Sequence, residues 1–169
     1  MNIREIKITD APAMLDLNMK LDEESDFMLF EKGERKLSVD SQAEIIKGAL
    51  DQKNVLWLVA ESKNGDLDGY CVVSGKPQFR VKHVGSLVIG VVKKSWSKGI
   101  GFRLLESAIE RSSDLGFTRL ELSVRSDNQR AISLYKKAGF VIEGERKNSL
   151  NISGNYFDEL YMAKVQKAH

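Results

Sequence analysis

The sequence contains few of the residues that mark disulfide-bonded, metal-binding or membrane-spanning proteins. It has two histidines and one cysteine, Cys71, which cannot form an internal disulfide. A lone thiol suits a reducing compartment. No apolar run approaches the roughly 18 residues of a transmembrane helix, and residues 1–5 lack the apolar stretch of a signal peptide. We therefore expect a cytoplasmic protein without a membrane partner and without a metal site.

The charge of one sign hardly exceeds that of the other. The 169 residues include 26 basic and 24 acidic side chains, which leaves a net charge of +2. So small a charge creates no overall field that would attract nucleic acid or an anionic membrane, and no nucleic-acid partner is expected. The length suits one domain, residues 1–169, with a sizeable core.

Two glycines stand between an apolar run at residues 87–92 and an amphipathic run at residues 100–115. The segment Ser95-Trp96-Ser97-Lys98-Gly99-Ile100-Gly101 therefore predicts a glycine loop between a strand and a helix. Glycines let a ligand approach the backbone closely, and the free N–H groups of a helix's first turn attract anions. Because Lys98 and Arg103 add positive charge, we expect a phosphate or pyrophosphate group here.

Two common nucleotide-binding motifs are absent. The string Gly-x-x-x-x-Gly-Lys-Ser/Thr of a Walker loop does not occur. Gly99-x-Gly101 is followed by Leu104, where a dinucleotide-binding motif needs a third glycine or alanine. These absences argue against a nucleotide-binding α/β domain and favour a different phosphate-bearing ligand.

The remaining pattern predicts an α+β fold with one mixed sheet and helices on both faces. We expect helices from Pro12 to about residue 22, from a capping box at Ser41-Gln42-Ala43-Glu44, over residues 99–115, and from Asp127 or Asn128 to Gly139. Strands are expected at residues 3–8, 55–61, 69–75, 83–92, 119–124, 140–152 and 156–165.

Residues 83–162 resemble the GNAT superfamily of N-acetyltransferases, which use acetyl coenzyme A (acetyl-CoA). Residues 91–101 resemble its pyrophosphate-binding motif. The run Ser126-Asp127-Asn128-Gln129-Arg130-Ala131-Ile132-Ser133-Leu134-Tyr135-Lys136-Lys137-Ala138-Gly139-Phe140 resembles its second motif in order and spacing. The resemblance implies a single GNAT-like domain whose central mixed, mostly antiparallel sheet has about seven strands.

In this family, the pantetheine arm of acetyl-CoA lies between two parallel strands that splay apart beyond the glycine loop. Here those strands would be residues 87–92 and 119–124. The acceptor amine enters from the opposite side and attacks the thioester directly in a ternary complex, so the lack of a Cys-His or Ser-His-Asp constellation is consistent. The resemblance implies cofactor contacts from Val91, Trp96, Ser97, Lys98, Gly99, Ile100, Gly101, Phe102, Arg103, Asn128 and Lys137.

Two positions depart from the family pattern. Trp96 stands where the loop motif usually opens with arginine or glutamine, which leaves its role open between packing and covering the phosphates. Ser86 stands where relatives often place a glutamate as base, and serine cannot remove a proton from an ammonium by itself. The second departure supports an alternative hypothesis, a catalytically inactive acyl-CoA-binding sensor module.

Tyr135 is the predicted catalytic residue. The matching tyrosine of the family lies near the thioester sulfur and can protonate the departing thiolate, and its presence argues against the sensor hypothesis. Tyr135 also falls on the apolar stripe of its helix with Ala131 and Leu134, so a packing role is the alternative.

The expected acceptor is a primary amine of a small molecule or a protein. The resemblance places Tyr156 and Asp158 beside it, and Glu24 and Phe27 come from an acidic segment at residues 23–36 that is either a substrate-facing loop or a charged connection. Its acids favour a cationic acceptor such as a polyamine. The base remains open between a water molecule and the acids Glu23, Glu24, Asp26 and Glu34. A homodimer is a further expectation from the relatives.

Overall fold

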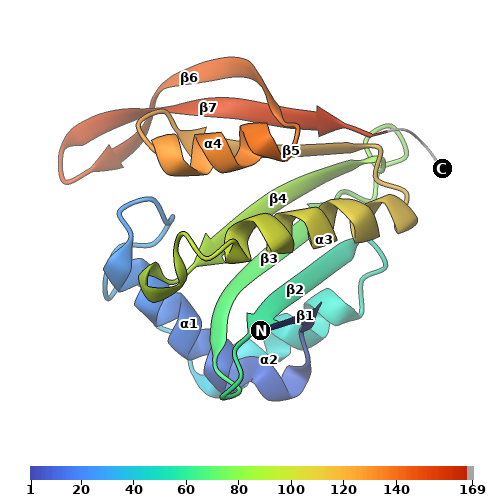
Figure 1. Ribbon diagram of the computed structural model, residues 1–169, viewed down its shortest axis with the longest axis vertical. Helices are drawn as coiled ribbons and strands as arrows, with labels where there is room; N and C mark the ends of the chain where they lie inside the picture. Colours follow the sequence, from blue (N-terminus) through green and yellow to red (C-terminus); the bar gives the residue numbers. More distant parts are fainter. Residues whose placement is uncertain (167–169) are drawn as a thin grey trace.

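The computed structural model describes residues 1–166 and contains one seven-stranded sheet with the strand order β1-β2-β3-β4-β5-β7-β6 (Figure 1). The strands are β1 (Asn2–Glu5), β2 (Val55–Glu61), β3 (Leu67–Gly75), β4 (Val84–Val91), β5 (Arg119–Arg125), β6 (Val141–Ile152) and β7 (Asn155–Val165). Only β4 and β5 pair in parallel, and every other neighbouring pair is antiparallel. The expected mixed, mostly antiparallel sheet is confirmed.

Four helices cover the two faces of this sheet, with an apolar cluster under each layer. The helices are α1 (Ala11–Glu24), α2 (Val39–Leu50), α3 (Ile100–Asp114) and α4 (Gln129–Lys137), with short 3-10 turns at Ile8–Asp10 and Lys93–Ser95. Side chains of α3 and α4, such as Leu104 and Ile132, pack in one cluster. Side chains of α1 and α2, such as Met14 and Ile46, pack in the other. In Figure 1, α4 lies beside β5 and β7, apart from α1 and α2.

Two helix starts and one strand end differ from the sequence prediction. Helix α2 begins at Val39 because Ser38 has an extended backbone and its hydroxyl accepts from the Ser41 N–H at 3.1 Å, so the capping residue is Ser38 rather than Ser41. Asp10 caps no helix with its side chain. Its carboxylate instead accepts from the Lys7 N–H and from Arg4, and this 3-10 turn ends the first strand at Glu5 rather than at residue 8.

The acidic segment after α1 forms turns and no helix or strand between residues 25 and 38. Arg35 fastens it to α1 through a two-pronged ion pair with Asp22, with Nε and Nη2 at 2.7 and 3.2 Å from the two carboxylate oxygens. We call residues 25–38 the α1–α2 loop.

Candidate active site

The sheet opens between β4 and β5. The two strands share only three paired positions within the described chain, Val84 with Arg119, Gly85 with Leu120 and Ser86 with Glu121. Beyond them β4 continues along β3 as far as Val91, and β5 continues along β7 as far as Arg125. The backbone edges of β4 and β5 that face this opening are therefore free to bond a ligand that lies between them. This is the splay that the sequence resemblance implies.

The glycine loop at the end of β4 presents a row of unpaired amides. The first N–H of α3 that bonds within the helix is that of Arg103, which donates to the Gly99 carbonyl at 3.0 Å. Among residues 1–166, no acceptor bonds the N–H groups of residues 97–102. Ser97 and Gly99 have left-handed backbones with φ of 59° and 76°, which turn these amides outward. Consecutive free amides at a helix start form an anion site.

Basic side chains surround these amides from two elements. Lys98 is exposed in the loop itself. From α4, the Lys137 ammonium lies 4.3 Å from the Phe102 ring, and the Arg130 guanidinium lies 3.1 Å from the Trp96 ring. Partial burial lowers the pKa of Arg130 below its usual value, although an arginine stays charged. The structure thus places Lys98, Lys137 and Arg130 at the glycine loop.

Trp96 has a defined role in the structure. Its indole Nε1 donates to the Val91 carbonyl at 2.7 Å, which ties the loop to the end of β4. An indole N–H is a donor, as are the side chains of the arginine or glutamine usual at this position. The substitution therefore keeps a donor at the start of the loop.

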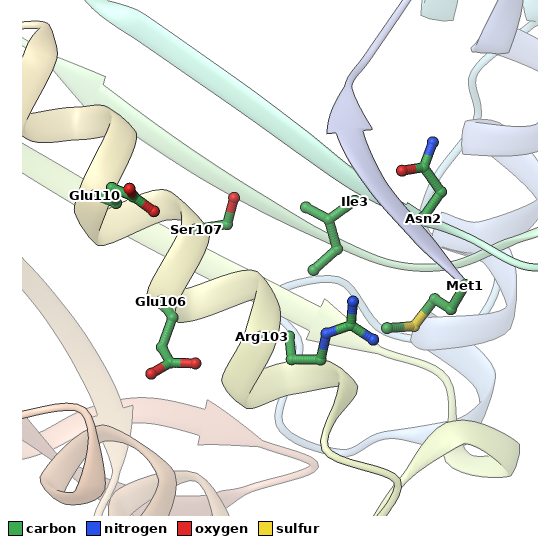
Figure 2. A pocket seen from close by; sticks show the side chains of 7 residues that line it. All are labelled: Met1, Asn2, Ile3, Arg103, Glu106, Ser107 and Glu110. Carbon is green, nitrogen blue, oxygen red and sulfur yellow. The ribbon is translucent and has the colours of Figure 1, made fainter.

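Arg103 does not join the loop amides. Its N–H bonds within the helix, and its side chain extends along the outer side of α3 toward Met1 (Figure 2). There it lines a groove between β1 and α3 together with Asn2, Glu106 and Glu110. This groove lies outside the opening between β4 and β5, so we assign it no part in the acetyl-transfer site.

Tyr135 lies in α4 within the apolar cluster beneath α3 and α4, and only 7% of its surface is exposed. Its ring packs against Phe140 with the centroids 6.0 Å apart. Burial raises the pKa of the phenol well above its usual value, so the hydroxyl keeps its proton at neutral pH. The same residue therefore packs in the core and carries a proton, and the two predicted roles are compatible.

Asn128 begins the helix that carries Tyr135. Its side-chain oxygen accepts from the Ala131 N–H at 3.2 Å, which is the expected capping bond. Gly101 approaches the same helix from the loop, because a Cβ built on it would lie 3.4 Å from Leu134 and 3.7 Å from Val91. These contacts fix α4 against the glycine loop.

The residues predicted to bind the acceptor have internal partners. The Glu24 carboxylate accepts from the Lys93 N–H at 2.6 Å, and Asp158 accepts from Lys147 Nζ and the Asn148 N–H. These bonds hold the pKa of Asp158 below its usual value. Tyr156 is 63% exposed near the tip of the β6–β7 hairpin. Tyr156 and Asp158 share one face of β7, whereas Glu24 at the end of α1 is bound to the 3-10 turn that follows β4.

Phe27 belongs to a stack that joins the α1–α2 loop to the far side of the opening. The Arg125 guanidinium lies 4.6 Å from the Phe27 ring and 3.9 Å from the Phe157 ring, and its Nη1 donates to the Asp26 carbonyl at 2.9 Å. Asp127 holds the same guanidinium from its other edge. We call Phe27, Arg125 and Phe157 the arginine stack. It closes the loop onto β5 and β7.

Sequence reasoning missed Arg125 and Phe157, although both stand one residue from a position it used. Arg125 ends the strand before the Ser126-Asp127-Asn128 motif, and Phe157 lies between Tyr156 and Asp158. Strand alternation puts Phe157 on the face of β7 opposite to its neighbours. The alternation of side chains along β7 assigns each residue to one of two faces, but it does not show which face contacts the α1–α2 loop.

The acids of the α1–α2 loop region are largely engaged. Glu23 pairs with Lys32 at 3.3 Å, Glu34 accepts from the Glu31 N–H at 2.9 Å, and Glu24 accepts from Lys93 as described. The sequence-based preference for a cationic acceptor rested on these charges, and their internal partners weaken it.

None of the helices in residues 1–166 has the length and apolar character needed to span a lipid bilayer. No cluster of metal-binding side chains occurs in the same residues.

Comparisons with known proteins agree with this geometry. The model of the acetyltransferase (GNAT) family matches residues 18–140. The chain is 35% identical to the L-amino acid N-acetyltransferase AaaT of Escherichia coli (strain K12) over 117 residues, 69% of this chain and 72% of that protein.

Solved structures show the same fold. A crystal structure of a GNAT-family acetyltransferase from Streptococcus pneumoniae is 32% identical, with a TM-score of 0.92 over 97% of this chain and 98% of that one. The structure of yncA from Salmonella typhimurium with its cofactor acetyl-CoA has a TM-score of 0.88 at 19% identity, over 100% of this chain and 95% of that one. On the family model and these similarities, the chain belongs to the acetyltransferase (GNAT) family.

Proposed function

We propose that this acetyl-CoA-dependent N-acetyltransferase acts on the primary amine of a small molecule, and specifically on the α-amino group of an amino acid. The observation that carries the proposal is the arginine stack. The stack holds the α1–α2 loop against β5, one of the two strands that border the opening, and we expect the loop held there to limit the access of a folded protein acceptor. The similarity to AaaT, an L-amino acid N-acetyltransferase, supports the same acceptor class.

The residues at the opening fit acetyl-CoA. The free amides of residues 97–102, with Lys98, Lys137 and Arg130 beside them, would hold the pyrophosphate, and the unpaired edges of β4 and β5 would bond the pantetheine amides. Acetyl-CoA supplies an activated acetyl thioester when bound. No protein nucleophile is required, because the acceptor amine itself attacks.

Two proton movements remain for the protein to assist. The Tyr135 hydroxyl, kept protonated by burial, would donate its proton to the sulfur that leaves. The acceptor's ammonium must lose a proton first. Ser86 cannot take it, and Glu23, Glu24 and Glu34 have partners, so we assign this step to a water molecule, with the Asp26 carboxylate as the alternative among the loop acids.

The proposal is tested by thiol release from acetyl-CoA in the presence of the twenty L-amino acids, spermidine and a peptide with a free amino terminus. We expect release with one or more amino acids and a rate at least about 100-fold lower for the Tyr135→Phe variant. Release with spermidine or the peptide alone would contradict the amino-acid assignment. Calorimetric binding of acetyl-CoA without release for any acceptor would favour the sensor hypothesis.

A further inference from the structure

Gly90 has no side chain, so the backbone of β4 is uncovered at this position on the side of the sheet that faces α1. It lies beyond the last position at which β4 pairs with β5, so it belongs to the opening. A Cβ built on Gly90 would lie 2.8 Å from Leu21 Cδ1, 3.0 Å from Tyr70 Cε1 and 3.6 Å from Met28 Cε. The Tyr70 ring therefore lies against the backbone of β4 on the face opposite to Tyr135.

Tyr70 has a hydroxyl with no hydrogen-bond partner among residues 1–166. The residue as a whole is 8% exposed, but its oxygen is not one of the fully buried unpaired atoms of these residues, so the hydroxyl can be reached from outside. A reachable hydroxyl beside the opening is free to donate a hydrogen bond to a ligand. Burial raises the pKa of Tyr70 to about 12, so this hydroxyl is a neutral donor at physiological pH.

Arg35 is bound to the residue that follows Leu21 in α1, and Leu21 and Tyr70 both lie beside Gly90. The Arg35 guanidinium is held by two groups: the Asp22 carboxylate accepts from Nε and Nη2, and the Phe30 ring lies 4.4 Å from Cζ. The side chain is 14% exposed. No acceptor within residues 1–166 bonds Nη1, so the fixed guanidinium keeps donors for a further carboxylate, the group whose geometry it matches best.

We propose that Tyr70 and Arg35 bind the carboxylate of the amino-acid acceptor, and that Asp22 positions the guanidinium. The inference rests on the proposed function and names the residues that would recognise the amino-acid substrate. A carboxylate held there directs the α-amino group of the same molecule toward Gly90 and the opening. Such a site would also favour amino acids over polyamines, because a polyamine has no carboxylate to accept from Tyr70 and Arg35 and its positive charges would meet the fixed guanidinium.

The test compares one L-amino acid that the enzyme acetylates with the carboxamide of the same amino acid. The carboxamide keeps the amine and the side chain and removes the negative charge. Dividing the KM of each variant by that of the wild type for each compound cancels the difference in amine basicity. For Tyr70→Phe and Arg35→Gln we expect the KM for the amino acid to rise roughly ten- to hundredfold, as for the loss of a hydrogen bond to a charged group. The KM for the carboxamide and for acetyl-CoA should change less than about twofold.

Arg4→Gln is the matched control. Arg4 is also partly buried and paired with two carboxylates, Asp10 and Glu61, but it lies on β1 at the far edge of the sheet. It should leave both KM values unchanged. If Arg35→Gln does not fold because Asp22 loses its partner, Tyr70→Phe decides the question, since it removes one unpaired oxygen atom.

Equal effects of Tyr70→Phe on the amino acid and its carboxamide would overturn the inference and leave the proposed function intact. If the wild-type enzyme acetylates no amino acid, the proposed function is wrong and this inference falls with it.

Discussion

The replacement of Tyr135 by phenylalanine isolates the chemical role of one oxygen atom. Tyr135 is 7% exposed as a residue, its hydroxyl makes no hydrogen bond within residues 1–166, and its oxygen is not one of the fully buried unpaired atoms. A hydroxyl that bonds no other group of the protein adds little to stability, so we expect the free energy of unfolding to change by less than about 1 kcal/mol. The contacts of the ring with Phe140 and the apolar cluster remain.

The kinetic effect is expected to be much larger. A positioned general acid contributes about 10²- to 10⁴-fold to a rate, equivalent to about 2.7–5.5 kcal/mol in the activation barrier. We therefore expect kcat of Tyr135→Phe to fall at least about 100-fold. The dissociation constant of acetyl-CoA should stay within about twofold, because the anion site consists of backbone amides at residues 97–102.

Single-turnover thiol release measures the chemical step, calorimetric titration measures acetyl-CoA binding, and thermal unfolding checks the fold. Tyr161→Phe is the control, since Tyr161 is 46% exposed, lies beside Arg146 and should keep the wild-type rate. A wild-type rate for Tyr135→Phe would refute the reasoning and leave Tyr135 with the packing role alone. Because burial raises the pKa of Tyr135, deprotonation of this residue should not lower the wild-type rate between about pH 7 and 9.

Four further variants, at two positions, test the glycine loop. In Gly101→Ala the new Cβ meets Leu134 and Val91 at ordinary contact distances, so the affinity for acetyl-CoA, measured by calorimetry, should stay near that of the wild type. Gly101→Asp adds a negative charge beside the free amides and should weaken acetyl-CoA binding at least about tenfold. Equal affinity of the two variants would contradict the anion site. Trp96→Phe removes the bond to the Val91 carbonyl, a loss of about 1 kcal/mol that should weaken acetyl-CoA binding several-fold, while Trp96→Gln, which keeps a donor, should weaken it less. Unchanged affinity for Trp96→Phe would show that this bond does not shape the loop.

The sequence predicted the cofactor side of the site better than the acceptor side. The glycine loop, the cap at Asn128 and the placement of Tyr135 depend on short segments whose residues are close in sequence, and local patterns describe such segments well. The start of α2 was misplaced because Ser38 and Ser41 both fit a cap, and only backbone geometry decides between them. The first strand was predicted to reach residue 8 because its apolar residues do not reveal that the Asp10 carboxylate accepts from Arg4 and from the Lys7 N–H and forms a turn there.

The acceptor side depends on contacts that no local pattern encodes. The Arg125 bond to the Asp26 carbonyl spans 99 residues, and the Glu24 bond to the Lys93 N–H spans 69. A carboxylate such as Glu24 looks available in the sequence until the fold supplies its donor. Likewise, only the pairing of β3 with β4 shows that Tyr70 lies beside Gly90 at the opening with its hydroxyl unpaired.

The short ladder of three residue pairs between β4 and β5 also means that the two parts of the sheet on either side of it are only weakly bonded to each other. Strands β5, β6 and β7 are bonded to one another along most of their lengths but to the rest of the sheet at only three pairs. Such a seam is where a protein opens locally at a lower free energy than global unfolding requires. A ligand that bridges the seam stabilises the closed form in proportion to the logarithm of its concentration. Acetyl-CoA bound between β4 and β5 would thus also tie the two parts of the sheet together, and we expect the resistance of this enzyme to proteolysis to rise with the acetyl-CoA concentration.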